Sequence, residues 1–177
     1  MEERALSRTM PLGDTTRARW DALYRAHAPA ARRLAFVLTR DESVADDLVQ
    51  DAFVRVLGRF RGDRSPESFA AYLRTTVVNL ARSRARRRGR ERRALEIEGG
   101  RARADDTVAD PAGRDDRVWT ALSELRPRRR AAVFLRYYEG LSHAEIATAL
   151  DCSPEAVKSL LRHGLAHLRR RLEEEET

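Results

Sequence analysis

The sequence predicts an all-α protein made of two small helical domains joined by a flexible linker. Apolar residues recur at spacings of three and four from Arg17 to about Arg93, and again from Val118 to Leu172. No stretch of useful length alternates apolar and polar residues as a half-buried strand does. The segment from about Glu96 to Asp116 has too few large apolar side chains to offset its ordering entropy, so it is predicted to be the linker.

The composition favours an anionic polymer as partner. The 177 residues carry a formal net charge of +7, and nearly all the basic side chains are arginines. Guanidinium groups form bidentate contacts with phosphate and are weakly hydrated. A coding bias toward GC-rich codons would also enrich arginine and alanine, so composition alone leaves the choice open.

The sequence contains no recognisable targeting signal. MEERALSRTMPLGDTTRARW lacks the apolar centre of a signal peptide, and no apolar run approaches the length of a membrane-spanning helix. The single cysteine permits no internal disulfide, which fits a reducing compartment. We therefore expect a soluble, cytoplasmic protein.

The first block is predicted to contain helices separated by short breaks. Pro29 allows a boundary of the first helix near it, and the next apolar face includes Leu34. The next helix carries an apolar stripe from Val44 to Leu57, and either Asp41 or Ser43 is expected to cap it. A loop, RFRGDRSPES, then precedes the last helix of the block.

On that last helix, Asn79, Arg82 and Arg86 are predicted to share one face, roughly opposite an apolar side. An amide and guanidinium groups on a continuous exposed face suit a nucleic-acid backbone and some base contacts. The arginine run from Arg82 to Arg93 adds a dense positive field for phosphates. Taken alone, such a run also occurs in solvated tails and in nonspecific RNA-binding arms.

The second block is predicted to contain a helix-turn-helix. Ser142 and Glu145 have the spacing of a capping box that opens a short helix. After a break at Asp151 and Cys152, the run Ser153-Pro154-Glu155 opens a second helix. Two capped helices with a short break between them form the helix-turn-helix pattern, whose second helix enters a major groove.

The outward side chains near the start of that second helix have the chemistry of base and phosphate contacts. Arginine and lysine suit guanine edges or phosphates, serine suits either, and glutamate accepts from cytosine. The same pattern also describes the solvated face of an ordinary core helix. The candidate residues are Glu155, Lys158, Ser159, Arg162 and His163.

A metal site is the alternative interpretation of this stretch, HAEIATALDCSPEAVKSLLRHGLAH. His163 and His167 are four residues apart and are expected to share a face, but His143 and Cys152 lie elsewhere along it. The C-x-x-C and H-E-x-x-H spacings are missing, and a small residue such as Cys152 suits packing in the turn. We therefore predict no metal and no other cofactor.

Three segments together resemble one family. DDLVQDAFVRVLGRF and SPESFAAYLRTTVVNLARSRARRR resemble the σ2 domain of bacterial extracytoplasmic-function (ECF, group 4) sigma factors of the sigma-70 family. LSELRPRRRAAVFLRYYEGLSHAEIATALDCSPEAVKSLLRHGLAHLRRRL resembles their σ4 domain. The resemblance implies a disordered tail at residues 1–16, a σ2 domain at 17–93, a linker at 94–116 and a σ4 domain at 117–174.

The resemblance also implies roles for matching positions. It places Asp47, Gln50 and Asp51 against the β′ clamp helices of core RNA polymerase, with a second contact to the β flap. The loop that contains Phe60, Arg61 and Asp63 matches the element that holds a flipped base of the −10 region.

The remaining roles concern promoter DNA and regulation. Asn79, Arg82 and Arg86 are expected to face the melted −10 strand. The outward residues on the second helix of the helix-turn-helix are expected to read the −35 element. Acidic linker residues would mimic RNA charge. The chain departs from the family at Leu160, where a basic residue is frequent, and at Gly164. An anti-sigma factor is expected as a separate partner.

Two other classes of protein remain as alternatives. A stand-alone helix-turn-helix regulator would share the DNA-binding block, but it would have no need for the acidic and amide surface of DDLVQDAF. An enzyme is disfavoured, because the neighbouring aspartates diverge on a helix and no general-base histidine accompanies them. The predicted function is therefore promoter-specific initiation without catalysis by this chain.

Overall fold

The computed structural model describes residues 14–59, 66–97 and 116–174, and every regular element in those ranges is an α-helix. The predicted all-α class is confirmed. The N-terminal residues 1–13, the loop residues 60–65, the linker residues 98–115 and the C-terminal residues 175–177 lie outside the described residues. No helix in the described part of the chain is long and apolar enough to cross a membrane.

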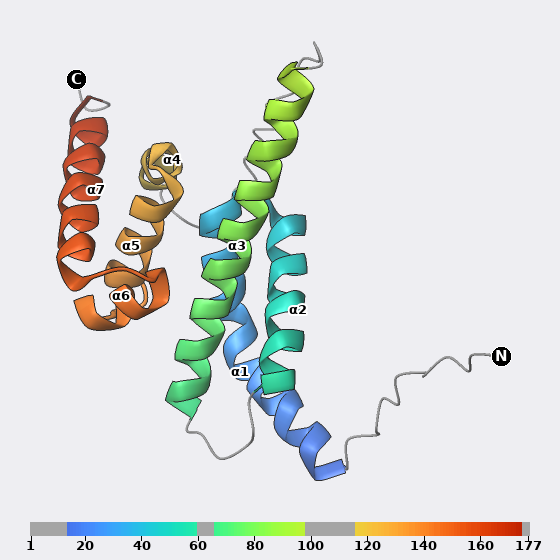
Figure 1. Ribbon diagram of the computed structural model, residues 1–177. Coiled ribbons are helices and arrows are strands. Elements are labelled where there is room, and N and C mark those ends of the chain that lie inside the picture. The colour runs from blue at the N-terminus through green and yellow to red at the C-terminus, as the bar shows by residue number, and fades with distance from the viewer. Residues whose placement is uncertain (1–13, 60–65, 98–115, 175–177) are drawn as a thin grey trace.

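The first bundle consists of α1 (Asp14–Thr39), α2 (Glu42–Arg59) and α3 (Pro66–Ile97), each of which packs against the other two (Figure 1). Their apolar stripes meet in a common core, in which Leu34 and Phe69 are almost fully buried. The Phe69 ring lies 5.9 Å from that of Phe53 and 6.1 Å from that of Trp20, measured between centroids. Burial of these stripes, as the spacing predicts, accounts for the bundle.

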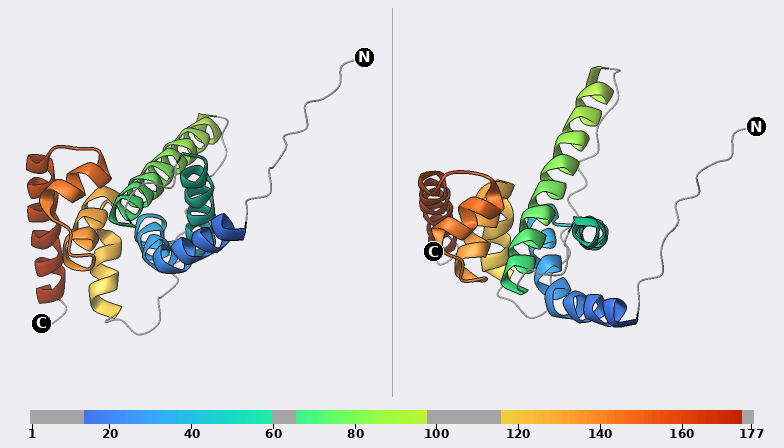
Figure 2. Two further views of the ribbon diagram at one scale, coloured as in Figure 1. Left: turned by 90° about the horizontal axis from the view of Figure 1, so that it is seen from below. Right: turned by 60° about the horizontal axis from the view of Figure 1, so that its bottom comes forward.

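The helix boundary that Pro29 would allow is absent, because α1 continues from Asp14 to Thr39 with Pro29 inside it. Proline removes one backbone donor and crowds the carbonyl of Arg25, four residues earlier, which bends a helix rather than always ending it. Figure 2 shows α1 changing direction between its first and second halves. The buried residues Ala31 and Leu34 follow Pro29 closely, and their packing holds the second half in helical form.

The break between α1 and α2 is short and defined by its own hydrogen bonds. Arg40 has a φ of 61°, which is left-handed and ends α1, and its amide donates to Phe36 O at 2.7 Å. Asp41 Oδ1 then accepts from the Val44 amide at 2.9 Å and caps α2. Of the two caps that the sequence offered, Asp41 is the one used.

Two helix ends differ from the predicted segments. The first helix begins at Asp14, inside the segment that was expected to be a tail, and α3 continues to Ile97, so residues 94–97 are helical rather than linker. Residues 94–97 read ALEI, and alanine, leucine and glutamate are good helix formers. The ion pair between Arg87 and Glu91 (3.4 Å) supports the turn that precedes them.

The second bundle consists of α4 (Asp116–Glu124), α5 (Pro127–Tyr137), α6 (His143–Leu150) and α7 (Pro154–Glu174). The last helix lies against the other three (Figure 1). The core of the bundle is a set of small and branched apolar side chains: Ala121, Leu125, Ala131, Leu135, Ile146, Leu150, Val157 and Leu161.

The two bundles lie side by side, with α1 against α5 and α3 against α6 (Figures 1 and 2). The long helix α3 therefore has the rest of its own bundle on one side and the helix-turn-helix on another. This arrangement positions every candidate site described below.

The glycine in α7 allows close approach of two helices. A Cβ added at Gly164 would lie 2.8 Å from Cγ2 of Val133 on α5. This position is buried, whereas a Cβ added at Gly89, on the exposed part of α3, would meet nothing within 4 Å. Gly164 is therefore a packing requirement of the second bundle.

We predict that Gly164→Ala lowers the free energy of unfolding by about 1–3 kcal/mol, because the added methyl group overpacks the contact with Val133. Gly89→Ala is the matched control and should raise it by roughly 0.5–1 kcal/mol through helix propensity. Urea denaturation followed by circular dichroism measures both. A Gly164→Ala protein as stable as wild type would contradict the packing requirement.

Candidate nucleic-acid interface

The first helix of the helix-turn-helix has the predicted capping box. Ser142 Oγ accepts from the Glu145 amide at 3.3 Å, and Glu145 Oε2 accepts from the Ser142 amide at 2.8 Å. At the other end, Asp151 adopts a left-handed φ of 50°, and the Cys152 amide donates to Ala147 O at 3.0 Å. These local bonds define the sharp turn after α6.

The second helix, α7, begins where the sequence predicts. The turn before it is held to α5 by Arg128, which the sequence analysis did not identify. Ser153 Oγ accepts from the Ala156 amide at 3.1 Å, which caps the helix. From α5, Arg128 Nη2 donates to Leu150 O at 2.9 Å and to Asp151 O at 3.1 Å. Arg128 therefore holds the turn in place from α5. In the sequence it is one of several adjacent arginines, and nothing there distinguishes it from the others.

The five predicted base-contacting residues of α7 form one exposed face. Glu155, Lys158, Ser159, Arg162 and His163 are all exposed. The His163 Nδ1 atom lies 2.7 Å from Ser159 O, and a carbonyl can only accept, so Nδ1 carries the proton in this hydrogen bond. In the neutral ring, Nε2 is then an acceptor directed away from the helix backbone.

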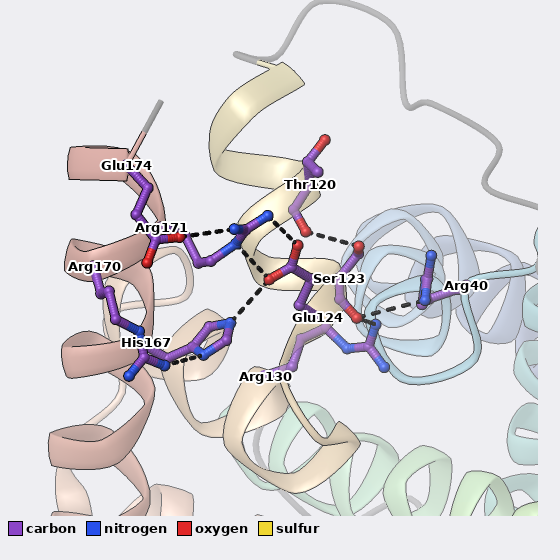
Figure 3. Close-up of polar contacts among 9 residues, drawn as sticks. All are labelled: Arg40, Thr120, Ser123, Glu124, Arg130, His167, Arg170, Arg171 and Glu174. Atoms are coloured by element: carbon purple, nitrogen blue, oxygen red, sulfur yellow. Dashed lines mark hydrogen bonds and ion pairs between the residues drawn. The ribbon is translucent and has the colours of Figure 1, made fainter. Parts of the chain in front are cut away.

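The candidate metal ligands are not brought together. His167 Nε2 lies 3.2 Å from Glu124 Oε2 on α4 (Figure 3). His163 instead bonds to Ser159 of its own helix. Cys152 is half-buried in the turn and packs against the core. Within residues 14–59, 66–97 and 116–174, no group of three or more His, Cys, Asp or Glu side chains is arranged to hold a metal ion.

Glu124 joins α4 to α7. Its carboxylate accepts from Arg171 Nη2 at 2.8 Å as well as from His167, and Arg171 also bonds to Glu174 at 2.9 Å (Figure 3). The hydrogen bond from Arg171 is the largest cause that lowers the pKa of Glu124. This network holds the C-terminal half of α7, and Arg128 holds the turn before its N-terminus. The helix that carries the exposed face is therefore held at both ends.

The residues predicted to face the −10 strand do not share one environment. Asn79 and Arg86 are exposed on α3, as expected. Arg82 is half-buried, and its Nη1 lies 3.6 Å from Oδ2 of Asp151, the residue at the turn of the helix-turn-helix. Arg82 is therefore already paired within the chain. Phe60, Arg61 and Asp63 lie outside the described residues.

The predicted polymerase-binding residues lie on the outer face of α2. Asp47, Gln50 and Asp51 are exposed, and their spacing of three and four places them on one side of the helix. Asp47 Oδ2 lies 3.7 Å from Nη1 of Arg84 on α3, a contact that the sequence did not predict because both residues were assigned to separate surfaces. Gln50 also lines a groove between α1 and α2 with Tyr24.

The comparisons with known proteins agree with this architecture. The family model for Sigma-70 region 2 matches residues 23–91, and the model for Sigma-70, region 4 matches residues 115–168. The chain is 38% identical over 157 residues to an RNA polymerase sigma-E factor of Streptomyces avermitilis, which covers 89% of this chain and 82% of that protein. The chain belongs to the extracytoplasmic-function group of RNA polymerase sigma factors.

A further relative is longer than this chain. The ECF RNA polymerase sigma factor SigE of Mycolicibacterium smegmatis is 37% identical over 155 residues, which cover 85% of this chain and 60% of that protein. The alignment therefore spans less than two thirds of the length of that relative.

Two solved structures share the fold. The sigma factor RpoE of Bartonella quintana, in complex with the anti-sigma factor NepR, has a TM-score of 0.71 at 24% identity and covers 88% of this chain and 97% of that one. CnrH, in complex with the cytosolic domain of CnrY, has a TM-score of 0.62 at 26% identity and covers 89% and 90% of the two chains.

The capping box predicts a pH dependence of stability. Hydrogen bonds from Ser142 lower the pKa of Glu145 in the folded chain, so the carboxylate stabilises the fold above its unfolded pKa and this contribution is lost as pH falls through the folded pKa. Glu145→Gln should therefore lower the urea midpoint more at about pH 7 than at about pH 3, because the carboxylate loses its charge as pH falls through the folded pKa. An equal loss at both pH values would contradict an ionic cap.

Proposed function

We propose that this chain binds core RNA polymerase and directs it to promoters, with α7 reading the −35 element and α3 contacting the melted −10 strand. The observation that carries the proposal is the exposed face of α7 at the end of a capped, rigidly supported turn. Arg162 and Lys158 on this face suit guanine edges, and Glu155 suits the amino group of cytosine. Family membership supports the same assignment.

The role of α3 is supported by its exposed basic surface. Asn79 and Arg86 are exposed, outside the core of the first bundle, and the arginine-rich part of the helix extends beyond them to Arg93. Such a surface binds phosphates with little sequence preference and leaves sequence reading to other residues. The loop with Phe60, Arg61 and Asp63 is proposed, from the family resemblance alone, to hold a flipped −10 base.

The outer face of α2 is proposed as the contact with the β′ clamp helices. Asp47, Gln50 and Asp51 give it two carboxylates and an amide on one side of the helix. A contact of the second bundle with the β flap follows from the family. A stand-alone DNA-binding regulator is the less favoured alternative, since the relatives found for both blocks are sigma factors.

Regulation by a separate anti-sigma protein is part of the proposal. The two solved relatives above are complexes with an anti-sigma factor, in one case, and with the cytosolic domain of CnrY, in the other. We place the chain in the cytoplasm, where core polymerase is found, and assign it no catalytic step and no cofactor.

Run-off transcription with core polymerase tests the proposal. Core plus this chain should initiate from a promoter library at defined sites, and core alone should not. Asp47→Asn with Asp51→Asn should lower core binding by about tenfold or more, because charged interface contacts are removed, whereas Glu42→Gln on the same helix is the matched control. Tight duplex binding without any initiation would favour the stand-alone regulator.

Two arginine variants separate reading from phosphate binding. Arg162→Ala should relax preference at one −35 position at a cost of about 1–3 kcal/mol for the preferred base. Arg86→Ala should instead weaken binding to all sequences alike and reduce the salt slope by about one. Filter binding over a salt series with a randomised −35 library measures both. Identical effects of the two variants on every sequence would rule out this division of roles.

A further inference from the structure

His163 differs chemically from the basic groups that accompany it on the exposed face of α7. Lys158 and Arg162 carry only hydrogen-bond donors, whatever they contact. A histidine ring has two nitrogen atoms, and the one that carries the proton donates while the other accepts. The contacts that His163 makes within α7 therefore decide which kind of base its ring can bind.

The surroundings of Nδ1 require it to carry the proton. Nδ1 of His163 lies 2.7 Å from Ser159 O and 3.4 Å from Ser159 Oγ. An unprotonated Nδ1 would place its lone pair against those of the carbonyl oxygen at 2.7 Å, which is unfavourable. The hydroxyl oxygen is then a second, weaker acceptor for the same N–H. One turn of α7 thus holds the ring in a single tautomer.

Nε2 is the atom of the ring that remains for a partner. His163 is exposed, and the buried stripe of α7 lies on the other side of the helix, at Val157, Leu161, Gly164 and Leu168. Within the described part of the chain, both hydrogen bonds of the ring are made by Nδ1. In a neutral ring with the proton on Nδ1, Nε2 has a lone pair and no hydrogen, so it can only accept.

The major groove offers an acceptor only one kind of partner on the base edges. Adenine N6 and cytosine N4 are amino groups that donate, whereas guanine O6 and N7 and thymine O4 accept. Every base pair has one such amino group, on one strand only. An acceptor that contacts one strand therefore distinguishes adenine and cytosine from the keto bases, guanine and thymine. The guanidinium group of Arg162 has the opposite requirement and suits guanine.

We propose that His163 determines specificity by selecting an amino base, adenine or cytosine, on the strand that it contacts within the −35 element. The inference rests on the proposed function, because it needs α7 to lie in the major groove. It goes further by naming the chemistry that is read at this position. Arg162 and His163, neighbours in the sequence, thus select opposite classes of base.

A phosphate contact is the alternative role for a histidine on this face. Phosphate oxygens only accept, so they repel the lone pair of an unprotonated Nε2, and the contact needs a protonated ring. Histidine side chains are mostly neutral above about pH 7, which favours the base contact. A phosphate contact would also strengthen binding to every sequence alike. The two roles therefore differ in their dependence on sequence.

His163→Arg reverses the chemistry of the contact. Arginine only donates, so the preferred base should change from adenine or cytosine to guanine, with a change of about tenfold or more in the ratio of amino to keto bases at that position. Ala166→Arg is the matched control, since it adds the same charge at an exposed position about one turn further along α7. It should strengthen binding to all sequences alike and leave the preferred bases unchanged.

His163→Ala is the second variant. It removes the acceptor without adding a donor, and alanine is the best helix former, so α7 is kept. The preference for an amino base should relax at one position by about threefold to tenfold, the factor that corresponds to one hydrogen bond. Preferences at the other positions of the −35 element should stay as they are in the wild type.

Two measurements on the full-length chain test the proposal. Nitrogen-15 NMR of the histidine rings at about pH 8, where histidine rings are neutral, should show the proton of His163 on Nδ1 and none on Nε2. The spectrum of His163→Ala identifies the signals. Transcripts are then sequenced from a barcoded promoter library that is randomised in the −35 element and transcribed by core polymerase with the chain. Adenine or cytosine should be enriched at the position whose preference His163→Arg reverses and His163→Ala relaxes.

Three results would overturn the proposal and leave the proposed function intact. The first is a ring with its proton on Nε2. The second is selection of guanine or thymine at the position that His163→Ala relaxes. The third is initiation from selected −35 sequences with the same base preferences in wild type and both His163 variants, which would make His163 a phosphate contact or a bystander. A library from which no promoter is initiated would instead contradict the proposed function, and the inference that rests on it would fall with it.

Discussion

The constraint on which the rest of the structure depends is that α3 packs against α1, α2 and α6 at once. Its apolar side, with Leu73 and Val77, completes the core of the first bundle. One flank carries Arg82 toward the helix-turn-helix, and another carries Arg84 toward Asp47 on α2. The side that remains exposed, with Asn79 and Arg86, is the one available to a partner. Because one rigid helix supplies all these surfaces, their relative positions are fixed.

In the second bundle, several contacts hold α7 in place, so that its exposed face has a fixed position relative to the other helices of the bundle. Local caps define where α6 ends and α7 begins, Arg128 holds the turn from α5, and Glu124 holds the far end of α7. Gly164 permits the close approach of α7 to Val133 on α5. A departure from the family pattern in sequence is thus accounted for by packing against Val133.

Many of the arginines in this protein form contacts within the chain rather than only facing solvent. A strongly basic chain would be expected to leave its arginines in water, yet Arg82, Arg84 and Arg171 are paired with carboxylates, and Arg130 is buried against a backbone carbonyl. The arginines of this chain therefore contribute to its folded structure as well as to its net positive charge.

The sequence by itself determined the helical class, the caps of α6 and α7, and the exposed face of α7, because each depends on residues within a few positions of one another. It limited the cap of α2 to two residues, of which the structure uses Asp41. The tertiary structure decided the rest. Pro29 lies within a continuous helix because later residues pack, and Arg82 and Asp47 are paired because α3 lies beside α6 and α2. Periodicity identifies which side of a helix is buried, but it carries no information on which helix covers it. Contacts between residues far apart in the chain are fixed only when the helices are assembled.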